Sequence, residues 1–143
     1  AGVDRSNIES KNKDEVALLL PLNPDESAMK IRNQIKEKIG IDVGIIITDS
    51  IGRAWRLGTI GHAIGSAGVK TLMDLRFKAK DLFERELQVT CIAWADQLAA
   101  AASLVMGETN EATPVVLIQG LDTPSSEDSI QDLIRPKKED LFR

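Results

Sequence analysis

Hydrophobic runs and a helical pattern alternate in the first third of the chain. The runs 16–20 and 43–47 are short and almost wholly apolar, which predicts two strands. The second run is rich in β-branched residues, as is typical of a strand covered on both faces. Residues 24–39, between the two runs, carry apolar positions at helical spacing and predict a helix. Strand, helix and strand in this order indicate a βαβ unit with parallel strands.

Local signals mark both ends of the predicted helix. Asn23 suits the N-cap, Pro24 suits the first helical position, and Glu26 completes a capping box. The apolar stripe of the helix comprises Met29, Ile31, Ile35 and Ile39. Gly40 follows directly and is predicted to end the helix.

The later pattern predicts further helices and one more strand. A short helix is expected at 67–75, a long helix at 90–106, a strand at 115–118 and a short helix near 130–134 in a polar tail. Residues 86–90 fit either a strand or the lead-in to the long helix. One face of the long helix carries Ile92, Ala95, Ala99 and Ala102, and Gly107 ends it. The alanine run 99–102 lets another element pack closely against this helix.

The segment TDSIGRAWRLGTIGHAIGSAG, residues 48–68, directly follows the second apolar run. Asp49 and Ser50 fall at the carboxyl end of the predicted strand, where open α/β sheets bind ligands. A carboxylate and a hydroxyl are hard-oxygen ligands suited to Mg²⁺ or Mn²⁺. The glycines that follow permit backbone N–H groups to approach an anion, and the guanidinium groups of Arg53 and Arg56 match phosphate or carboxylate. The segment therefore predicts a metal–phosphate site.

A plainer interpretation of the same segment stays open. An aspartate at a strand end is common as a helix cap or turn former, and glycine-rich segments are often tight turns. The glycine spacing matches neither the P-loop nor the G-x-G-x-x-G pattern. His62 has no neighbouring acid or cysteine in the sequence, which favours a structural or supporting role over that of a catalytic base.

Composition and charge exclude several classes of protein. The chain has 143 residues, 43% hydrophobic and 28% charged, as one globular domain does. The net charge of −4 and the few aromatic residues disfavour a nucleic-acid-binding face. No apolar run approaches the roughly twenty residues of a membrane span, and the polar start lacks the pattern of a signal peptide. A single cysteine, Cys91, fits a reducing compartment, so we expect a cytoplasmic protein without membrane partners.

Several separated blocks recur in the order typical of one family. They are GVDRSNI (2–8), IIITDSIGRAWRLG (45–58), AIGSAG (63–68), RELQVT (85–90) and DQLAAAASLVMGE (96–108). In wording and order they resemble the coenzyme F-420-0: L-glutamate ligase family, the gamma-glutamyl ligases. The resemblance runs from residue 2 to about residue 120 and implies a GTP-dependent, divalent-metal-dependent amide ligase. Such an enzyme joins the amine of L-glutamate to a carboxylate of a deazaflavin coenzyme precursor through an acyl phosphate.

The resemblance also implies roles for individual residues. Asp4 and Asp49 correspond to ligands of a first metal, Mg²⁺ or Mn²⁺, and Ser50 and Glu108 to ligands of a second. The residues expected at the nucleotide are Asn7, Met106, Gly107 and Thr113. Arg53 and Arg56 belong to the family's wording and are the candidate catalytic residues; their charge suits phosphates, a coenzyme phosphodiester or the glutamate carboxylate.

The chain departs from the family pattern in two places. FKAKDLFE, residues 77–84, puts Phe77 and Glu84 at glycine-like positions and indicates an altered loop on the acceptor side. The resemblance also implies a long upstream portion, because the family's motifs begin almost at residue 1 of this sequence. We therefore expect an α/β (α+β) fold with a mixed sheet, an incomplete metal- and nucleotide-binding domain at 1–122, and a polar tail at 123–143. A homodimer is expected, and the alternative function is that of a non-catalytic interaction or assembly module.

Overall fold

The computed structural model describes residues 3–4, 6–8, 16–122 and 125–140. Within these ranges the chain combines two α-helices with three separate two-stranded sheets, all antiparallel. The expected combination of α and β structure is confirmed. The expected parallel βαβ unit is wrong, because strand Ile45–Arg53 (β3) pairs with the strand that follows it and strand Leu18–Leu19 (β2) pairs with the N-terminal strand.

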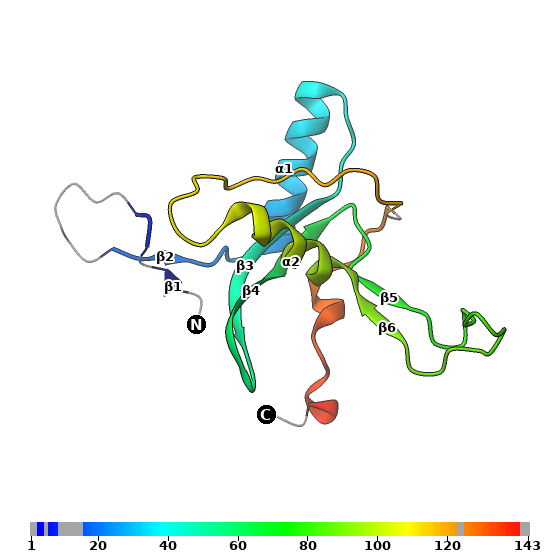
Figure 1. Ribbon diagram of the computed structural model, residues 1–143. Helices are drawn as coiled ribbons and strands as arrows, with labels where there is room; N and C mark the ends of the chain where they lie inside the picture. Colours follow the sequence, from blue (N-terminus) through cyan, green and yellow to red (C-terminus); the bar gives the residue numbers. More distant parts are fainter. Residues whose placement is uncertain (1–2, 5, 9–15, 123–124, 141–143) are drawn as a thin grey trace.

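A long β-hairpin forms the centre of the molecule (Figure 1). Its strands are β3, Ile45–Arg53, and β4, Arg56–Ala67, so the glycine-rich segment is mostly strand rather than loop. The helices α1, Pro24–Ile39, and α2, Trp94–Met106, pack against the hairpin on opposite faces (Figure 1). The segment 48–68 is therefore not the flexible backbone that its glycines suggested, and the metal–phosphate site expected there stays a prediction.

A β-bulge explains how one strand receives a helix on each face. Ile47 pairs with Gly65 while Thr48 pairs with Ala63, so Ile64 is an extra residue in β4. In a regular strand, residues four apart share a face, and one inserted residue reverses that relation. The parts of β4 before and after Ile64 therefore meet different helices.

Two glycines of β4 lie where these helices come closest. A Cβ atom on Gly61 would stand 2.7 Å from the backbone oxygen of Ala99 in α2. A Cβ atom on Gly65 would stand 2.5 Å from the backbone of Pro24 in α1. Neither space can hold a side chain, so these glycines allow close helix packing rather than a flexible loop.

The boundaries of α1 follow the local signals, but its buried face does not follow the apolar stripe. Asn23 Oδ1 accepts a hydrogen bond from the backbone N–H of Glu26 at 3.1 Å, and Gly40 ends the helix with φ +77°. Ala28 is fully buried, whereas Ile31 and Ile39 are 44% and 65% exposed. The one fully buried residue of the helix is thus an alanine outside the stripe, while Met29 and Ile35 are half-buried and Ile31 and Ile39 lie on the surface.

Helix α2 begins later than the sequence predicts. Cys91–Ala93 forms strand β6, which pairs with β5, Leu72–Asp74, so the helix starts at Trp94 instead of residue 90. Ala95, Ala99 and Ala102 are buried as predicted, and Gly107 ends the helix. With Ala63 of β4 and Ile130 of the tail, two of these alanines form the core cluster.

The remaining elements correct or refine the sequence prediction. The short helix expected at 67–75 is wrong, because Ala67 ends β4 and β5 follows; the strand expected at 115–118 has no regular structure. The strand expected at 16–20 is the short β2, Leu18–Leu19, which pairs with β1, Val3–Asp4. The strand expected at 43–47 is β3, which is half-buried rather than covered on both faces. The tail helix is confirmed as a 3₁₀ turn, η1, Ile130–Leu133, and a second turn, η2, spans Lys137–Glu139.

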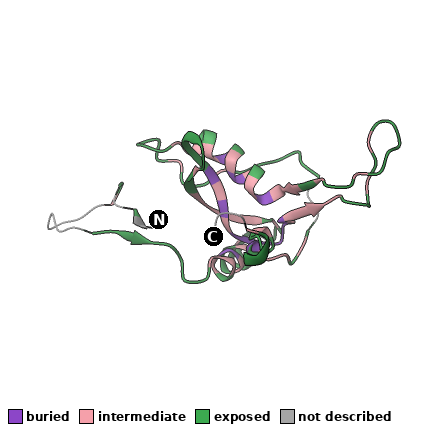
Figure 2. Ribbon diagram, turned by 90° about the horizontal axis from the view of Figure 1, so that it is seen from below, coloured by how far each residue is buried: buried purple, intermediate pink, exposed green. Residues whose placement is uncertain are grey.

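Three parts of the chain extend away from this core: the β1–β2 ribbon, the arm between β5 and β6, and the end of the tail (Figures 1 and 2). The accessible surface is 11228 Å², whereas a compact chain of 15.6 kDa exposes about 7,000 Å². Many large apolar side chains are accordingly exposed, among them Leu22, Leu57 and Leu82. Neither helix in the described ranges is long and apolar enough to cross a membrane.

Candidate functional site

A groove of about 1240 Å³ lies between the hairpin, the β1–β2 ribbon and the loop that follows α2. These elements converge on the left of the molecule in Figure 1. The groove is lined by Asp4, Ser6, Asn7, Leu18–Leu20, Asp49–Gly52, His62, Ile64 and residues 106–114. Segments more than a hundred residues apart in the sequence therefore form one surface.

The structure brings the predicted metal and nucleotide residues together in this groove. All four candidate metal ligands line it: Asp4, Asp49, Ser50 and Glu108. All four candidate nucleotide residues line it as well: Asn7, Met106, Gly107 and Thr113. One detail differs from the sequence prediction, since Asp49 and Ser50 lie within β3 and not beyond its end.

The pairing of the hairpin divides these groups between its two faces. Asp49 is opposite His62, and Ser50 is opposite Gly61, on which α2 packs. Successive strand residues point to opposite faces, so the Asp49 carboxylate and the Ser50 hydroxyl are not adjacent oxygens on one face. Ser50 thus lies on the side of α2, whose end leads to Glu108. The hairpin thus places Asp49 and Ser50 on opposite faces, and the division of the four ligands between two metal ions stays a prediction.

The loop after α2 is held in shape by Glu111. The Glu111 carboxylate accepts hydrogen bonds from the backbone N–H of Thr109 at 2.8 Å and from the Thr109 hydroxyl. The hydrogen bond from the Thr109 N–H is the main reason that the pKa of Glu111 lies below its usual value. The sequence reasoning missed Glu111; its signal was a helix-ending glycine followed closely by threonine and an acid.

Asn7 connects the N-terminal segment to the same loop. Its side-chain Nδ2 donates a hydrogen bond to the backbone oxygen of Thr109 at 2.8 Å, across 102 positions of sequence. Asp4, three residues earlier, accepts hydrogen bonds from the backbone N–H and the hydroxyl of Ser6. The hydrogen bond thus joins the N-terminal segment to the loop, and both segments line the groove with Asp4.

The charged side chains in the described lining of the groove are all carboxylates. Its lining includes four carboxylates, from Asp4, Asp49, Glu108 and Glu111, and no lysine or arginine among the described lining residues. The carboxylates are spread along the groove: within the described ranges, no three His, Cys, Asp or Glu side chains are grouped closely enough to hold a metal ion. Hard oxygen donors fit Mg²⁺ or Mn²⁺, and such a groove attracts cations and repels free anions.

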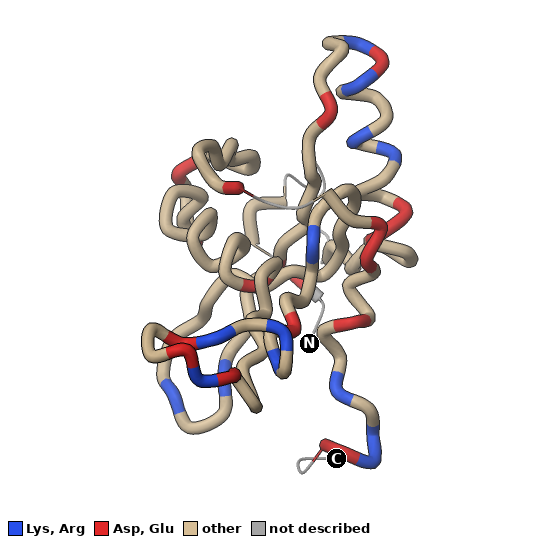
Figure 3. The backbone as a smooth tube through the Cα atoms, turned by 90° about the vertical axis from the view of Figure 1, so that its right-hand side faces the viewer, with Lys and Arg blue, Asp and Glu red and all other residues tan. Residues whose placement is uncertain are grey.

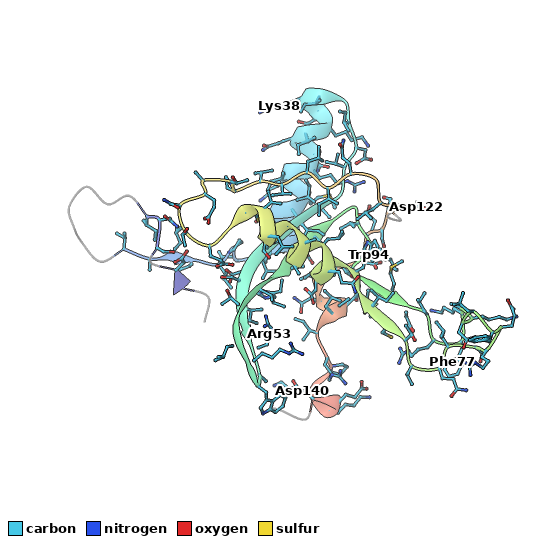
Figure 4. The ribbon with its side chains drawn as sticks, in the orientation of Figure 1. Lys38, Arg53, Phe77, Trp94, Asp122 and Asp140 are labelled. Carbon is cyan, nitrogen blue, oxygen red and sulfur yellow. The ribbon has the colours of Figure 1, made fainter. Side chains whose placement is uncertain are left out.

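The two candidate catalytic arginines lie elsewhere. Arg53 and Arg56 pair with each other at the far end of the hairpin, and neither lines the groove (Figure 4). Arg53 Nη2 donates to the backbone oxygen of Leu57 at 3.4 Å, while Arg53 Nη1 is buried without a hydrogen-bond partner among the described residues. Their catalytic role stays a prediction.

The arm between β5 and β6 bears out one expectation about its residues. Phe77 and Glu84 have φ angles of +57° and +62°, in the left-handed region that favours glycine. They are therefore glycine-like positions occupied by larger side chains, as the sequence indicated. The Phe77 side chain lies out on the arm, far from the hairpin, and the arm carries a dense mixture of charges (Figures 3 and 4).

Comparison with known proteins confirms the resemblance seen in the sequence blocks. A family model described as F420-0:gamma-glutamyl ligase matches residues 1–120. The chain is similar to the coenzyme F420:L-glutamate ligases of Methanocaldococcus jannaschii, 51% identical over 143 residues, and Archaeoglobus fulgidus, 45% identical over 143 residues. Both alignments cover 100% of this chain but 55% of the relative, so the chain spans about half the length of these relatives. The chain belongs to the F420-0:gamma-glutamyl ligase family.

Proposed function

We propose that this chain carries the metal- and GTP-binding part of a ligase that adds L-glutamate to a carboxylate of an F420 coenzyme precursor. The observation that carries the proposal is the acidic groove, in which residues from the N-terminal segment, the hairpin and the loop after α2 meet. A nucleoside triphosphate is strongly anionic, and the described lining offers it no lysine or arginine. The triphosphate therefore binds together with divalent cations, which are held by the carboxylates of the groove.

The roles of the groove residues follow from their chemistry. Asp4 and Asp49 would hold one Mg²⁺ or Mn²⁺ ion, and Ser50 and Glu108 a second. When bound, these ions would offset the charge on the phosphates and on the acceptor carboxylate. Asn7 and the loop held by Glu111 would contact the nucleotide through backbone and amide groups. The chain's own residues thus orient the reactants for acyl phosphate formation and for attack by the glutamate amine.

Other parts of the proposal concern the protein around this groove. The curated relatives are nearly twice as long as this chain, and the exposed apolar surface suits contact with further protein. The proposed activity is that of the whole protein, which we expect to be a cytoplasmic homodimer. Arg53 and Arg56 are the candidate partners of acidic groups on glutamate or the acceptor that extend beyond the groove.

Metal-dependent nucleotide binding by the chain is the direct test. We expect calorimetry to detect binding of GDP in the presence of Mn²⁺ and none with GDP after EDTA treatment. Asp49→Asn should weaken this binding at least tenfold, whereas Glu37→Gln on the surface of α1 should leave it unchanged. Equal binding with and without metal would contradict the proposal. Glutamate-dependent release of GDP by the native protein, with an F420 precursor as acceptor, tests the reaction itself.

A second candidate function has one observation in its favour. The large exposed apolar surface would equally suit a non-catalytic interaction or assembly module. In that case the folded chain would give no heat with Mn²⁺ or GDP, and Asp49→Asn would have no effect on any ligand.

A further inference from the structure

We propose that His62 accepts a hydrogen bond from the amine of the incoming L-glutamate through its Nε2 atom. This inference rests on the proposed ligase function and adds a residue that contacts the substrate. His62 is the single histidine of the chain and lies in the lining of the groove. Its imidazole orients the amine, so that the nitrogen lone pair is directed at the acyl carbon.

The hairpin fixes which imidazole nitrogen faces the ligand. His62 Nδ1 lies 3.0 Å from the backbone oxygen of Asp49, the residue directly opposite it in the strand pair. A carbonyl oxygen only accepts hydrogen bonds, so Nδ1 carries the proton in this contact. In the neutral imidazole, Nε2 then keeps its lone pair and acts as an acceptor. No described residue donates a hydrogen bond to Nε2, which leaves that atom for a ligand.

The surroundings of His62 favour an amine over an anion as its partner. The Asp49 carboxylate belongs to the same face of the hairpin, and the described lining of the groove has no cationic side chain. A phosphate or carboxylate oxygen has no hydrogen to donate to the Nε2 lone pair, whether or not a metal ion offsets the charge of Asp49. A neutral amino group has N–H donors that match this lone pair and keeps its own lone pair for the acyl carbon.

The position of His62 also fits the order of the proposed reaction. His62 lies on β4, and Ile64 of the same strand and Leu18 and Leu19 of β2 line the groove with it. The loop end, from Met106 to Thr113, is where the nucleotide is expected. An amine held at His62 therefore approaches from the hairpin side, apart from the phosphates.

Because the chain has one histidine, magnetic resonance can test the geometry without any activity. A long-range ¹H–¹⁵N spectrum of the 143-residue chain should show the Nδ1–H tautomer, and addition of L-glutamate should shift the Nε2 signal. The Nε2–H tautomer would overturn the inference whatever the enzyme does. A shift of the Nε2 signal with Mg²⁺–GDP and none with L-glutamate would overturn it as well, because the imidazole would then serve the nucleotide.

Kinetics of the native protein separate this inference from the proposed function. His62→Ala should raise the KM for L-glutamate about five- to tenfold, the loss of one neutral hydrogen bond, and leave the KM for GTP within about twofold. His62→Gln, whose side-chain oxygen can accept the same bond, should recover most of the loss, and Glu37→Gln should behave as wild type. An active wild type with an unchanged glutamate KM in His62→Ala refutes the role of His62. A wild type without glutamate-dependent GDP release refutes the ligase function itself.

Discussion

Two groups of carboxylates in this molecule accept hydrogen bonds of different range. The first group, Asp25 and Asp128, belongs to a polar clasp that joins the start of α1 to the tail. The clasp also includes Ser66, Thr71 and Ser129. Asp25 accepts hydrogen bonds from the Ser66 N–H at 2.8 Å and the Ser129 hydroxyl at 2.7 Å, across 41 and 104 positions. The second group lines the groove, where Asp49 accepts from the N–H of the next residue and Glu111 from Thr109.

The two groups of carboxylates differ in the range of their hydrogen bonds. In the clasp, each carboxylate accepts hydrogen bonds from distant segments, and these bonds hold the tail on the core. In the groove, the Asp49 and Glu111 bonds come from residues one or two positions away, which orients a carboxylate without joining segments. Carboxylates oriented in this way keep oxygen lone pairs for cations. The difference predicts that the two groups respond to mutation in opposite ways.

The largest expected effect is on stability, at the clasp. Asp25→Asn replaces one acceptor oxygen by an NH₂ group facing the Ser129 hydroxyl and the Ile130 N–H, both of which now donate to Asp25. We expect the free energy of unfolding to fall by about 3 kcal/mol, measured by urea denaturation. Binding of Mn²⁺ at a temperature where the variant is folded should be unchanged. A variant of wild-type stability would mean that the clasp does not hold the tail.

The next largest effect is on metal binding, at Asp49 in the groove, with little change in stability. Asp49→Asn should lower the affinity for Mn²⁺ by about 10- to 100-fold in calorimetry, because a neutral amide is a poor ligand for a hard cation. Its unfolding free energy should stay within about 0.5 kcal/mol of wild type, since the lost hydrogen bond is local. If Asp49→Asn destabilises the chain as much as Asp25→Asn, local and long-range bonds do not separate the two groups.

The pH dependence of stability sharpens the comparison at Asp128. Burial raises the pKa of this carboxyl, but hydrogen bonds from Ser126, Lys70 and the Thr71 N–H outweigh it and hold the pKa below the usual value. A lowered pKa in the folded state stabilises the fold above the unfolded pKa of about 3.9, and this contribution is lost as the pH falls further. Asp128→Asn should cost about 1–2 kcal/mol at pH 7 and progressively less below pH 4 in thermal melts.

The smallest effect belongs to neither group. Phe77 has φ +57° on the exposed arm, a conformation that costs a side-chain-bearing residue about 1 kcal/mol relative to glycine. Phe77→Gly should therefore raise the unfolding free energy by up to about 1 kcal/mol. In the Phe77→Gly variant, Asp25→Asn should still lower the stability and Asp49→Asn should still lower the Mn²⁺ affinity by the same amounts, because the sites are independent. A loss of stability would show that the Phe77 ring packs on something that outweighs its backbone strain.

Local signals in the sequence predicted the helix ends correctly, because a helix end depends on groups within one turn of it. Asn23, Pro24 and Gly40 marked α1 because a cap acts on backbone groups within one turn. Gly107 ended α2 for the same reason. The matching sequence blocks also identified the groove residues, since a family pattern reflects shared function even where the residues lie far apart in sequence. Asp4, Asp49 and Glu108 indeed line one groove.

The sequence misled where the outcome depends on distant partners. The glycines of residues 48–68 suggested a loop, yet Gly61 and Gly65 lie in strand β4, where they let α2 and α1 pack closely. The bulge at Ile64, which turns the two parts of β4 toward different helices, has no local signal in the sequence. The isoleucine stripe of α1 suggested a buried face, but Ala28 is the buried residue and Ile31 and Ile39 are exposed. Strand pairing was wrong for the same reason: β2 and β3 find partners that periodicity cannot specify.

The sequence by itself therefore determined the helix ends, the buried alanine face of α2 and the oxygen-rich chemistry of the groove. These depend on the backbone groups and side chains of short segments, whose preferences persist in any context. Only the tertiary structure decided which faces are buried, that the glycine-rich segment is a hairpin, and that Arg53 and Arg56 lie away from the groove. Those outcomes depend on long-range pairing and close packing, because a strand or helix face is buried only when a distant segment covers it.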